Sequence, residues 1–524
     1  MTGTGDVEIP VLVVGGGPVG LSTAIGLRHF GIDCLLVERH PSTSLFPKGR
    51  AISTRSMEIF RQWGIEDAVT AAGLPRDESL FIYLGDTLRA PEFHRFGAKD
   101  IGFSDHSPTA PLICSQDVLE PVLRERATAR GADVRFDHRL VGFTQDEDGV
   151  SAEVRAAGGS AFRVRCDYLV GADGSRSTVR EQLRIAVDGP GVVGAPNISI
   201  LVEADLSAAV ADRRSALYWL GQPPPGSVFA VVDNDRRWLL MHTFDPAVHD
   251  EASFTDERCI ALVRQAVGDP QLAVRYVARQ FWQPQAVVAE RFRAGRVFLA
   301  GDAAHLTTPM GGLGMNCGIG DAHNLVWKLA AVLGRWGGPR LLDSYEVERR
   351  PVARWSVETS VALQDEPEGP RRRLLDGIVL GYRYESEVVV PDGTVPPAVD
   401  DPLRQYLPVA RPGHRAPHVW WTRDGERRSI LDLFGDAFVV LTDATGRDAV
   451  AAVADTLDGG SGVPLRWHAV DAPGWSEAYG LRPGGVVLVR PDGQVAWRSA
   501  AKPPDLAQAL RTALAVALHG ARRD

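Results

Sequence analysis

The spacing of apolar and polar positions changes along the chain, and the first stretch predicts an α/β unit. Residues 9–14 form an apolar run typical of a buried strand, and residues 18–30 continue with apolar positions at helical spacing. A second apolar run follows at 33–38, so the opening predicts a strand, a helix and a second strand. The amphipathic spacing of 115–131 predicts a further helix.

A different pattern begins near residue 186. Short stretches that alternate apolar and polar positions, such as NISILVEADL and RRWLLMHTF, predict a mostly antiparallel sheet. An apolar strand that leads into a turn returns at 295–305, and helices are predicted at 318–336 and, continuing across Pro351, at 344–364. We therefore expect a nucleotide-binding layer that is interrupted by a β-sheet domain and then resumed.

The C-terminal part has its own organisation. Residues 386–415 are rich in Pro, Asp and Gly, which predicts a linker. A strand, a helix, a strand, a hairpin and a final helix follow, in an order typical of a thioredoxin-like domain. No cysteine follows Cys317, which excludes thiol redox chemistry in that domain. The predicted nucleotide-binding layer comprises residues 1–185 and 286–385, and the β-sheet domain comprises 186–285. The linker is predicted at 386–415 and the C-terminal domain at 416–524.

Composition narrows the class of protein. The chain has 524 residues, of which 44% are hydrophobic, so it can bury more than one core. Its net charge of −9 disfavours nucleic acids and anionic membranes as partners. Five widely spaced cysteines give neither a disulfide framework nor a metal site, and no leader or membrane-spanning run is visible. We expect a soluble cytoplasmic protein without a metal.

The first motif is Gly15-Gly16-Gly17-Pro18-Val19-Gly20, with the spacing G-x-G-x-x-G between a strand and a helix. The first glycine permits the tight turn, the second permits backbone to approach a pyrophosphate, and the third permits the helix to pack on the strand. Glu38, at the end of the second strand, is placed to accept a hydrogen bond from a ribose hydroxyl. The motif predicts a dinucleotide site, and the alternative is a plain glycine turn.

Two later segments place candidate ligands at strand ends. Asp173 and Gly174 follow a predicted strand, where the alternative is an ordinary Asp-Gly turn. Gly301 and Asp302 follow another, which puts a carboxylate where ligands bind in open α/β sheets. The glycine-rich stretch 309–316 opens onto a helix, so its amides converge on whatever lies before them, and the alternative is a simple capping loop.

Taken together, GGGPVG with Glu38, the Asp-Gly segment and the AGDAAH…P-x-G-G-x-G-x-N segment resemble the single-component class A flavoprotein monooxygenases, the p-hydroxybenzoate hydroxylase superfamily. The cysteine-free tail, VLGYRYES at 379–386 and LVRPDGQVAWR at 488–498 resemble actinobacterial anthracycline and angucycline hydroxylases. The resemblance implies an α/β fold: a Rossmann-like FAD-binding domain, interrupted by a mostly antiparallel substrate domain and followed by a thioredoxin-like domain.

The resemblance also implies which residues bind FAD. Lys48 stands where the family usually has arginine, which leaves open whether Lys48 or Arg50 contacts the cofactor. The amides before the second glycine-rich helix would face the isoalloxazine ring and stabilise its reduced anion. The implied FAD-binding residues are Gly15, Gly17, Pro18, Gly20, Glu38, Arg39, Lys48, Arg50, Gln116, Asp173, Gly301, Asp302, Pro309, Gly312, Gly314, Met315 and Asn316.

The implied reaction is hydroxylation of a polycyclic polyketide phenol through a flavin C4a-hydroperoxide, with O2 and transiently docked NADPH as co-substrates. Baeyer–Villiger or epoxidising chemistry on the same scaffold, and a non-oxygenating FAD oxidoreductase, remain alternatives. NADH is an alternative electron donor to NADPH, and a homo-oligomer is an alternative to a monomer. An interaction protein built around the tail is a non-enzyme alternative.

Substrate contacts are the least determined part of the prediction. The resemblance places Arg383 near a substrate phenolate, and the alternative is a surface arginine. His305 is expected to be structural or close to the flavin. Aromatic residues on the predicted strands could wall a flat ligand or belong to the core; they are Tyr218, Trp219, Trp238, His242 and Phe281.

Overall fold

A parallel sheet forms the centre of the molecule. The computed structural model describes residues 6–79, 82–96, 105–222, 227–233, 235–364, 375–423 and 425–519. In this sheet β1 (Val7–Val14) lies between β2 (Cys34–Glu38) and β10 (Ala161–Gly171), parallel to both. The full order is β18-β19-β10-β1-β2-β7, and β8 and β9 extend it antiparallel beside β10. The outer strands are β7 (Asp133–Phe136), β8 (His138–Gln145), β9 (Val150–Ala156), β18 (Arg293–Ala294) and β19 (Val297–Leu299).

The return of the chain to this sheet confirms the predicted interruption. β19 pairs in parallel with β10, although more than a hundred residues separate them. Helix α1 (Pro18–His29) contacts both α5 (Gln116–Ala129) and α9 (Leu313–Leu333). Helix α10 (Ser344–Ala362) runs through Pro351 without a break, as predicted. No described helix is long and apolar enough to cross a membrane.

The middle domain is a seven-stranded sheet in the order β16-β12-β15-β14-β13-β4-β5. Its main strands are β12 (Asn197–Glu203), β13 (Leu217–Leu220), β14 (Ser227–Val231), β15 (Arg237–Thr243) and β16 (Arg275–Trp282). Helix α8 (Asp256–Val267) contacts β16. The sheet also takes β4 (Ile82–Gly85) and β5 (His94–Phe96) from a segment that the sequence analysis placed in the nucleotide-binding layer. The reason is non-local, because β4 pairs in parallel with β13.

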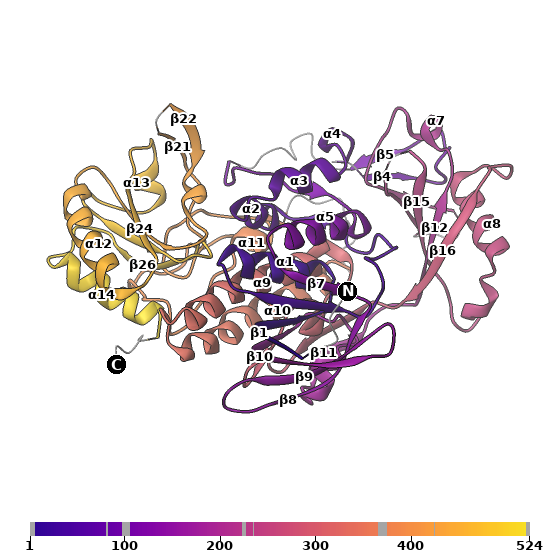
Figure 1. The fold of residues 1–524 in the computed structure, drawn as a ribbon. Helices are drawn as coiled ribbons and strands as arrows, with labels where there is room; N and C mark the ends of the chain where they lie inside the picture. Colours follow the sequence, from indigo (N-terminus) through magenta and orange to yellow (C-terminus); the bar gives the residue numbers. More distant parts are fainter. Residues whose placement is uncertain are drawn as a thin grey trace.

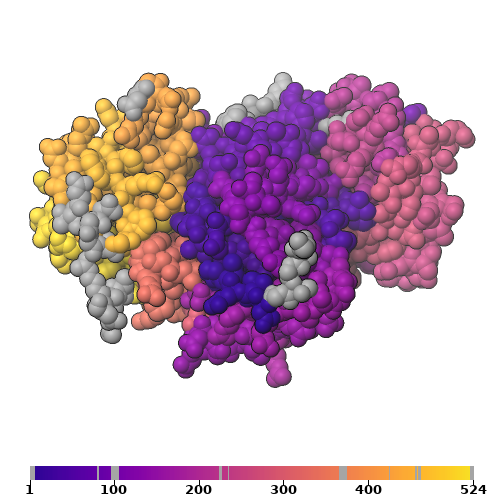
Figure 2. Space-filling model, in the orientation of Figure 1, coloured from indigo at the N-terminus to yellow at the C-terminus, as the bar shows by residue number. Residues whose placement is uncertain are grey.

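The C-terminal domain has the predicted order of elements. Its sheet runs β24-β23-β25-β26, with β23 (Phe438–Thr442) parallel to β24 (Leu465–Ala469) and antiparallel to β25 (Val486–Val489). A hairpin leads to β26 (Val495–Ser499). The helices are α12 (Arg447–Ser461), α13 (Trp475–Ala478) and α14 (Leu506–Ala517). Figure 1 shows this domain and the middle domain on opposite sides of the parallel sheet, and Figure 2 shows them at opposite ends of the molecule.

Residues 386–415, expected to be a linker, lie along the hairpin of the C-terminal domain. The amide of Val390 donates to the carbonyl of Ala496, and the amide of Gly413 donates to the carbonyl of Val495. The segment therefore adds backbone pairing to the domain instead of separating it from the rest of the chain.

The remaining elements are short. They are β3 (Ala51–Ile52), α2 (Thr54–Gln62), α3 (Glu66–Ala72), α4 (Arg76–Ser79), β6 (Leu112–Ile113), α6 (Thr178–Gln182), β11 (Val187–Val192), α7 (Ser207–Val210), β17 (Gln285–Ala289), β20 (His305–Leu306), α11 (Asp376–Leu380), β21 (Trp420–Arg423) and β22 (Glu426–Ser429). Strands β11, β17 and β20 form a small sheet, of which β17 and β20 contact α10.

Candidate functional site

The glycine turn after β1 is too crowded for side chains. Gly15 has φ of 114°, and a Cβ there would lie 2.2 Å from the carbonyl oxygen of Ala172. A Cβ at Gly20 would lie 1.9 Å from the carbonyl oxygen of Gly15. At Gly17, by contrast, a Cβ would fit, because its nearest neighbour would be Glu120 Oε1 at 3.9 Å. Gly17 caps α1 without a side-chain hydrogen bond, and Pro18 begins the helix. The first amides of α1 are thus free of a side-chain cap, as an anion site requires.

Glu38 closes this turn from the end of β2. Its carboxylate accepts a hydrogen bond from the amide of Gly16 at 2.7 Å and another from the amide of His40 at 2.8 Å. The His40 ring lies 2.5 Å from the same carboxylate. Arg39 is exposed. Glu38 therefore holds the turn and is partly available to a ligand.

The segment 44–50 lies between the glycine turn and the middle sheet. Arg50 donates to the carbonyl of Ala216 at 3.0 Å and to that of Val231, so its guanidinium joins two domains. Lys48 is exposed, and its positive charge opposes the burial that raises the pKa of Asp302. Lys48 thus lies close enough to affect Asp302, the carboxylate predicted to bind the flavin, whereas the guanidinium of Arg50 is hydrogen-bonded to the middle sheet.

Gln116, the first residue of α5, binds this segment. Its amide nitrogen Nε2 donates to Glu120 at 2.6 Å, its Oε1 accepts from the amide of Gly49 at 3.3 Å, and its backbone amide donates to the carbonyl of Gly49 at 2.7 Å. Glu120 also accepts from the amide of Ser44 at 2.6 Å. Burial raises the pKa of Glu120, and these hydrogen bonds oppose that rise. The sequence analysis did not single out Glu120, since only the spacing of four residues from Gln116 could have indicated it.

Asp173 makes the contacts of a helix cap. It accepts from the hydroxyl of Ser177 at 2.5 Å and from the amide of Val179 at 3.1 Å, at the start of α6. Burial raises its pKa, and those two hydrogen bonds act in the opposite direction. Because Ala172 lies against Gly15, the Asp-Gly segment still borders the glycine turn.

Gly301 and Asp302 follow β19 and face the same region. Gly301 has φ of 59°, and a Cβ there would lie 2.8 Å from a methyl carbon of Val19 in α1. Asp302 is exposed to solvent at this edge, while the surrounding protein desolvates its carboxyl group enough to raise the pKa. The carboxylate is thus presented beside the first turn of α1, at the carboxyl end of a central strand, as predicted.

The glycine-rich stretch before α9 also matches its predicted geometry. Gly311 and Gly312 are left-handed, with φ of 78° and 61°, and Gly312 caps α9 without a side-chain hydrogen bond. Asn316 fixes the turn: its Oδ1 accepts from the Ser53 amide at 2.8 Å, and its Nδ2 donates to the carbonyl of Gly312 at 2.7 Å. The other predicted members flank it: Pro309 is exposed, a Cβ at Gly314 would lie 2.8 Å from Thr307, and Met315 borders Gly49.

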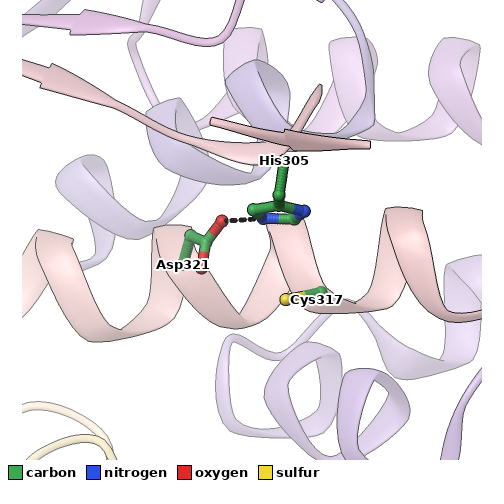
Figure 3. Close-up of side chains that lie close together, drawn as sticks. All are labelled: His305, Cys317 and Asp321. Carbon is green, nitrogen blue, oxygen red and sulfur yellow. Dashed lines mark hydrogen bonds and ion pairs between the residues drawn. The ribbon is translucent and has the colours of Figure 1, made fainter. Parts of the chain in front are cut away.

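A buried charged cluster lies behind these segments (Figure 3). His305 Nε2 lies 2.7 Å from Asp321 Oδ2, and Arg349 Nε donates to Asp321 Oδ1 at 2.8 Å. Arg349 also donates to the carbonyl of Cys317 at 3.0 Å and to the hydroxyl of Tyr384 at 3.1 Å. The sequence analysis missed Asp321 and Arg349, although a carboxylate within an apolar helix is a signal.

His305, Cys317 and Asp321 would also be a candidate metal set, because their ligand atoms lie within 4.8 Å of one another. Arg349 contacts both Asp321 and Cys317, so a cation already occupies this cluster. A divalent ion would be repelled by the guanidinium, which makes the cluster a poor metal site.

Four of the five aromatic residues that could wall a ligand or belong to the core lie in or against the core of the middle domain. Tyr218 is fully buried, with its hydroxyl donating to the carbonyl of Arg213 at 2.7 Å. Trp238 is fully buried, with its indole donating to the carbonyl of Ala204 at 3.1 Å. These residues belong to the core shared with α8, and His242 and Phe281 pack there with Phe254. Alternation divides a strand into two faces but does not tell which one meets the cofactor.

The opposite face points to the nucleotide-binding layer. Phe46, from the segment that carries Lys48, packs against a small apolar cluster on this face. The cluster comprises Leu201, Ala230, Val232 and Leu239, with Leu217 and Met241 beside them. Trp219, two positions from Leu217 on β13, shares the face, and its indole nitrogen is buried without a partner among the described residues.

Arg383 lies on the surface. Its Nε donates to Glu385 at 2.8 Å, and its backbone forms a bridge with His414. These contacts favour the surface interpretation over the substrate one.

Comparisons with known proteins agree with this geometry. A family described as FAD binding domain matches residues 8–360, and one described as aromatic-ring hydroxylase, C-terminal, matches residues 409–518. A putative polyketide hydroxylase of Streptomyces halstedii is 40% identical, over 94% of this chain and 93% of its own. A tetracenomycin A2 monooxygenase-dioxygenase of Streptomyces glaucescens is 40% identical, over 97% and 96%. The solved structure of an aklavinone-11 hydroxylase with FAD and aklavinone has a TM-score of 0.89, 37% identity and coverage of 98% and 99%.

Proposed function

The chain belongs to the FAD-dependent aromatic-ring hydroxylases, and from this premise we propose that it hydroxylates a flat polycyclic phenol of the polyketide type. The electron donor in this proposal is NADPH and the oxidant is O2. The observation that carries the proposal is the meeting of three segments, the glycine turn, Asp302 and the uncapped start of α9, opposite an apolar sheet face. Related proteins named for polyketide substrates support the substrate class.

The residues present fit FAD. The uncrowded position of Gly17 and the uncapped start of α1 suit its pyrophosphate, and Glu38 suits the adenosine ribose. Asp302, whose pKa is affected by the charge of Lys48, would bind the ribityl chain, together with Gln116, which is hydrogen-bonded to Gly49 next to Lys48. Bound FAD supplies the activation of oxygen that no amino-acid side chain provides.

The protein's own part is positioning and electrostatics. The amides at the start of α9, with the positive end of the helix dipole, stabilise negative charge on a ring placed before them. The apolar face with Phe46, Leu217 and Met241 excludes water and orients a flat ring system. Trp219 offers a hydrogen bond to a phenolate or ketone oxygen.

The test is NADPH oxidation by the FAD-loaded protein in air, with and without a panel of polycyclic phenols, together with product masses. We expect a substrate-stimulated rate and the gain of one oxygen atom. An oxygenated product with an opened ring would instead establish Baeyer–Villiger chemistry. Flavin reduction without oxygenated product for any phenol would establish a non-oxygenating oxidoreductase, and a parallel assay with NADH decides the donor.

A further inference from the structure

Glu120 is a buried carboxylate on α5, one helical turn after Gln116. Its two oxygens have different partners. Oε1 accepts a hydrogen bond from Gln116 Nε2 at 2.6 Å, and Oε2 accepts one from the amide of Ser44 at 2.6 Å. Hydrogen bonds to an ionised acceptor are short and strong, so they hold a side chain and a backbone segment in defined positions. Glu120 therefore fixes both of its donors.

The two donors belong to segments that are assigned to FAD. Gln116 is expected at the ribityl chain, and its Oε1 accepts from the amide of Gly49 at 3.3 Å. The other donor begins the segment 44–50. The glycine turn is also close, because a Cβ added at Gly17 would have Glu120 Oε1 as its nearest neighbour, at 3.9 Å. Glu120 thus lies where three parts of the predicted cofactor site meet.

The fold alone does not require a charged group at this position. The other buried residues of α5 are apolar, namely Leu119, Leu123 and Ala127. A buried carboxylate costs free energy of desolvation that an apolar side chain of similar size does not. The hydrogen bonds to Gln116 and to the segment 44–50 offset that cost, so they are the reason for a carboxylate here.

We propose that Glu120 is a positioning residue for FAD, which orients Gln116 toward the ribityl chain and holds the segment 44–50 beside the glycine turn before the cofactor binds. This inference rests on the FAD contacts assigned in the proposed function. Groups that are already ordered lose less conformational entropy on binding, so Glu120 strengthens FAD binding through the two groups that it holds.

The test is the dissociation constant of FAD for the apoprotein of Glu120→Leu, measured by fluorescence titration. Leucine fits the apolar side of α5 but accepts no hydrogen bond, so we expect the dissociation constant to rise about tenfold. A merely structural role would lower the melting temperature of the apoprotein and leave the FAD affinity of the folded variant unchanged. The matched control is Glu125→Leu, which removes an exposed carboxylate from the same helix and should leave FAD affinity unchanged.

A double-mutant cycle with Gln116→Ala tests whether Glu120 acts through Gln116. The single variant Gln116→Ala removes the side chain that Glu120 orients, so part of the effect of Glu120→Leu is already lost in that background. We expect Glu120→Leu to raise the dissociation constant of FAD less in Gln116→Ala than in the wild type. Equal fold-changes in the two backgrounds would overturn the inference.

Glu120→Gln provides a second variant if Glu120→Leu does not fold. Its carboxamide oxygen can accept from only one of the two donors, so we expect a smaller rise in the dissociation constant of FAD. Wild-type FAD affinity in either folded variant would overturn the inference. The proposed function is judged separately, because wild-type protein that binds FAD but oxygenates no phenol would contradict that function and leave these affinities unaffected.

Discussion

Two tryptophans of the middle sheet, the fully buried Trp238 and the partly buried Trp219, differ in the contacts of their indole nitrogens, both of which are buried. Trp238 donates to the carbonyl of Ala204 in the core beside α8, whereas Trp219 lies on the face toward the nucleotide-binding layer and has no partner in the part of the chain that the structure describes. A buried donor without an acceptor is costly unless a ligand completes it. The difference separates a residue that stabilises the fold from one available to a substrate.

Trp219→Phe removes the indole N–H donor and keeps an aromatic ring at this position. A single hydrogen bond contributes about 1 kcal/mol, so we expect the KM for the phenol to rise about fivefold with a smaller effect on kcat. Trp238→Phe should instead leave KM unchanged and lower the free energy of unfolding by about 1–3 kcal/mol, because it leaves the Ala204 carbonyl unpaired. Steady-state kinetics and thermal melting of both variants measure these effects. Equal KM values for Trp219→Phe and wild type would refute a hydrogen bond from Trp219 to the substrate.

Asp302 is expected to bind the cofactor and not to hold the fold. The residue is exposed to solvent at the edge of the loop. Asp302→Ala should weaken FAD binding by roughly tenfold to a hundredfold, because a hydrogen bond to a charged group contributes about 1.5–3 kcal/mol. The melting temperature of the apoprotein should not change. The control is Asp188→Ala, which removes an exposed carboxylate paired with Arg354. Full FAD occupancy in Asp302→Ala at limiting cofactor would contradict the assignment.

At the scale of elements, the spacing of residues along the chain predicts those helices, strands and turns that depend on neighbouring residues. The strand, glycine turn and helix at the start, α9 after its glycines, and α10 across Pro351 were all predictable from spacing. The pairing of β4 with β13, and the choice of sheet face for Trp219, depend on contacts between distant segments. Periodicity carries no information about such pairings, and the charged pair of Asp321 with Arg349 is equally non-local.

The segment 44–50 offers a test at this scale, because its two cations face different partners. Lys48→Met should raise the dissociation constant of FAD, since it removes a positive charge beside Asp302 and Glu120. Arg50→Met should leave FAD affinity nearly intact but lower the melting temperature, since the carbonyls of Ala216 and Val231 lose their donor. FAD titration and melting of both variants measure this, and the reverse pattern would assign cofactor contact to Arg50.

At the scale of the whole molecule, buried ion pairs join the C-terminal domain to the FAD-binding part. Glu348 on α10 accepts from Arg490 at 2.6 and 2.9 Å and from Lys328 on α9 at 2.7 Å. Asp492 pairs with Arg490, and Glu58 on α2 pairs with Arg415. All of these groups are almost fully buried. The domain without cysteines is therefore an integral part of the structure, because removing it would leave buried charges unpaired.

Arg490→Met should destabilise the whole protein, because it leaves Lys328 as the one cation paired with Glu348 and removes the cation paired with Asp492. Loss of one partner of a buried pair costs about 3–5 kcal/mol, so the melting temperature should fall by several degrees at neutral pH. Arg466→Met, which breaks an exposed pair with Asp436, is the control and should change stability by less than about 1 kcal/mol.

The pH dependence of this loss follows from Glu348. Burial raises its pKa, but Arg490 and Lys328 outweigh burial and hold the pKa well below the ordinary value. A carboxyl with a lowered folded-state pKa stabilises the protein fully above its unfolded pKa of about 4.3, and that stabilisation is lost as the pH falls toward the folded-state pKa. The stability difference between wild type and Arg490→Met should therefore be constant near neutrality and narrow below about pH 4. Chemical denaturation at pH 7 and pH 3 measures it, and a difference that widens in acid would show that Glu348 does not depend on Arg490 for its charge.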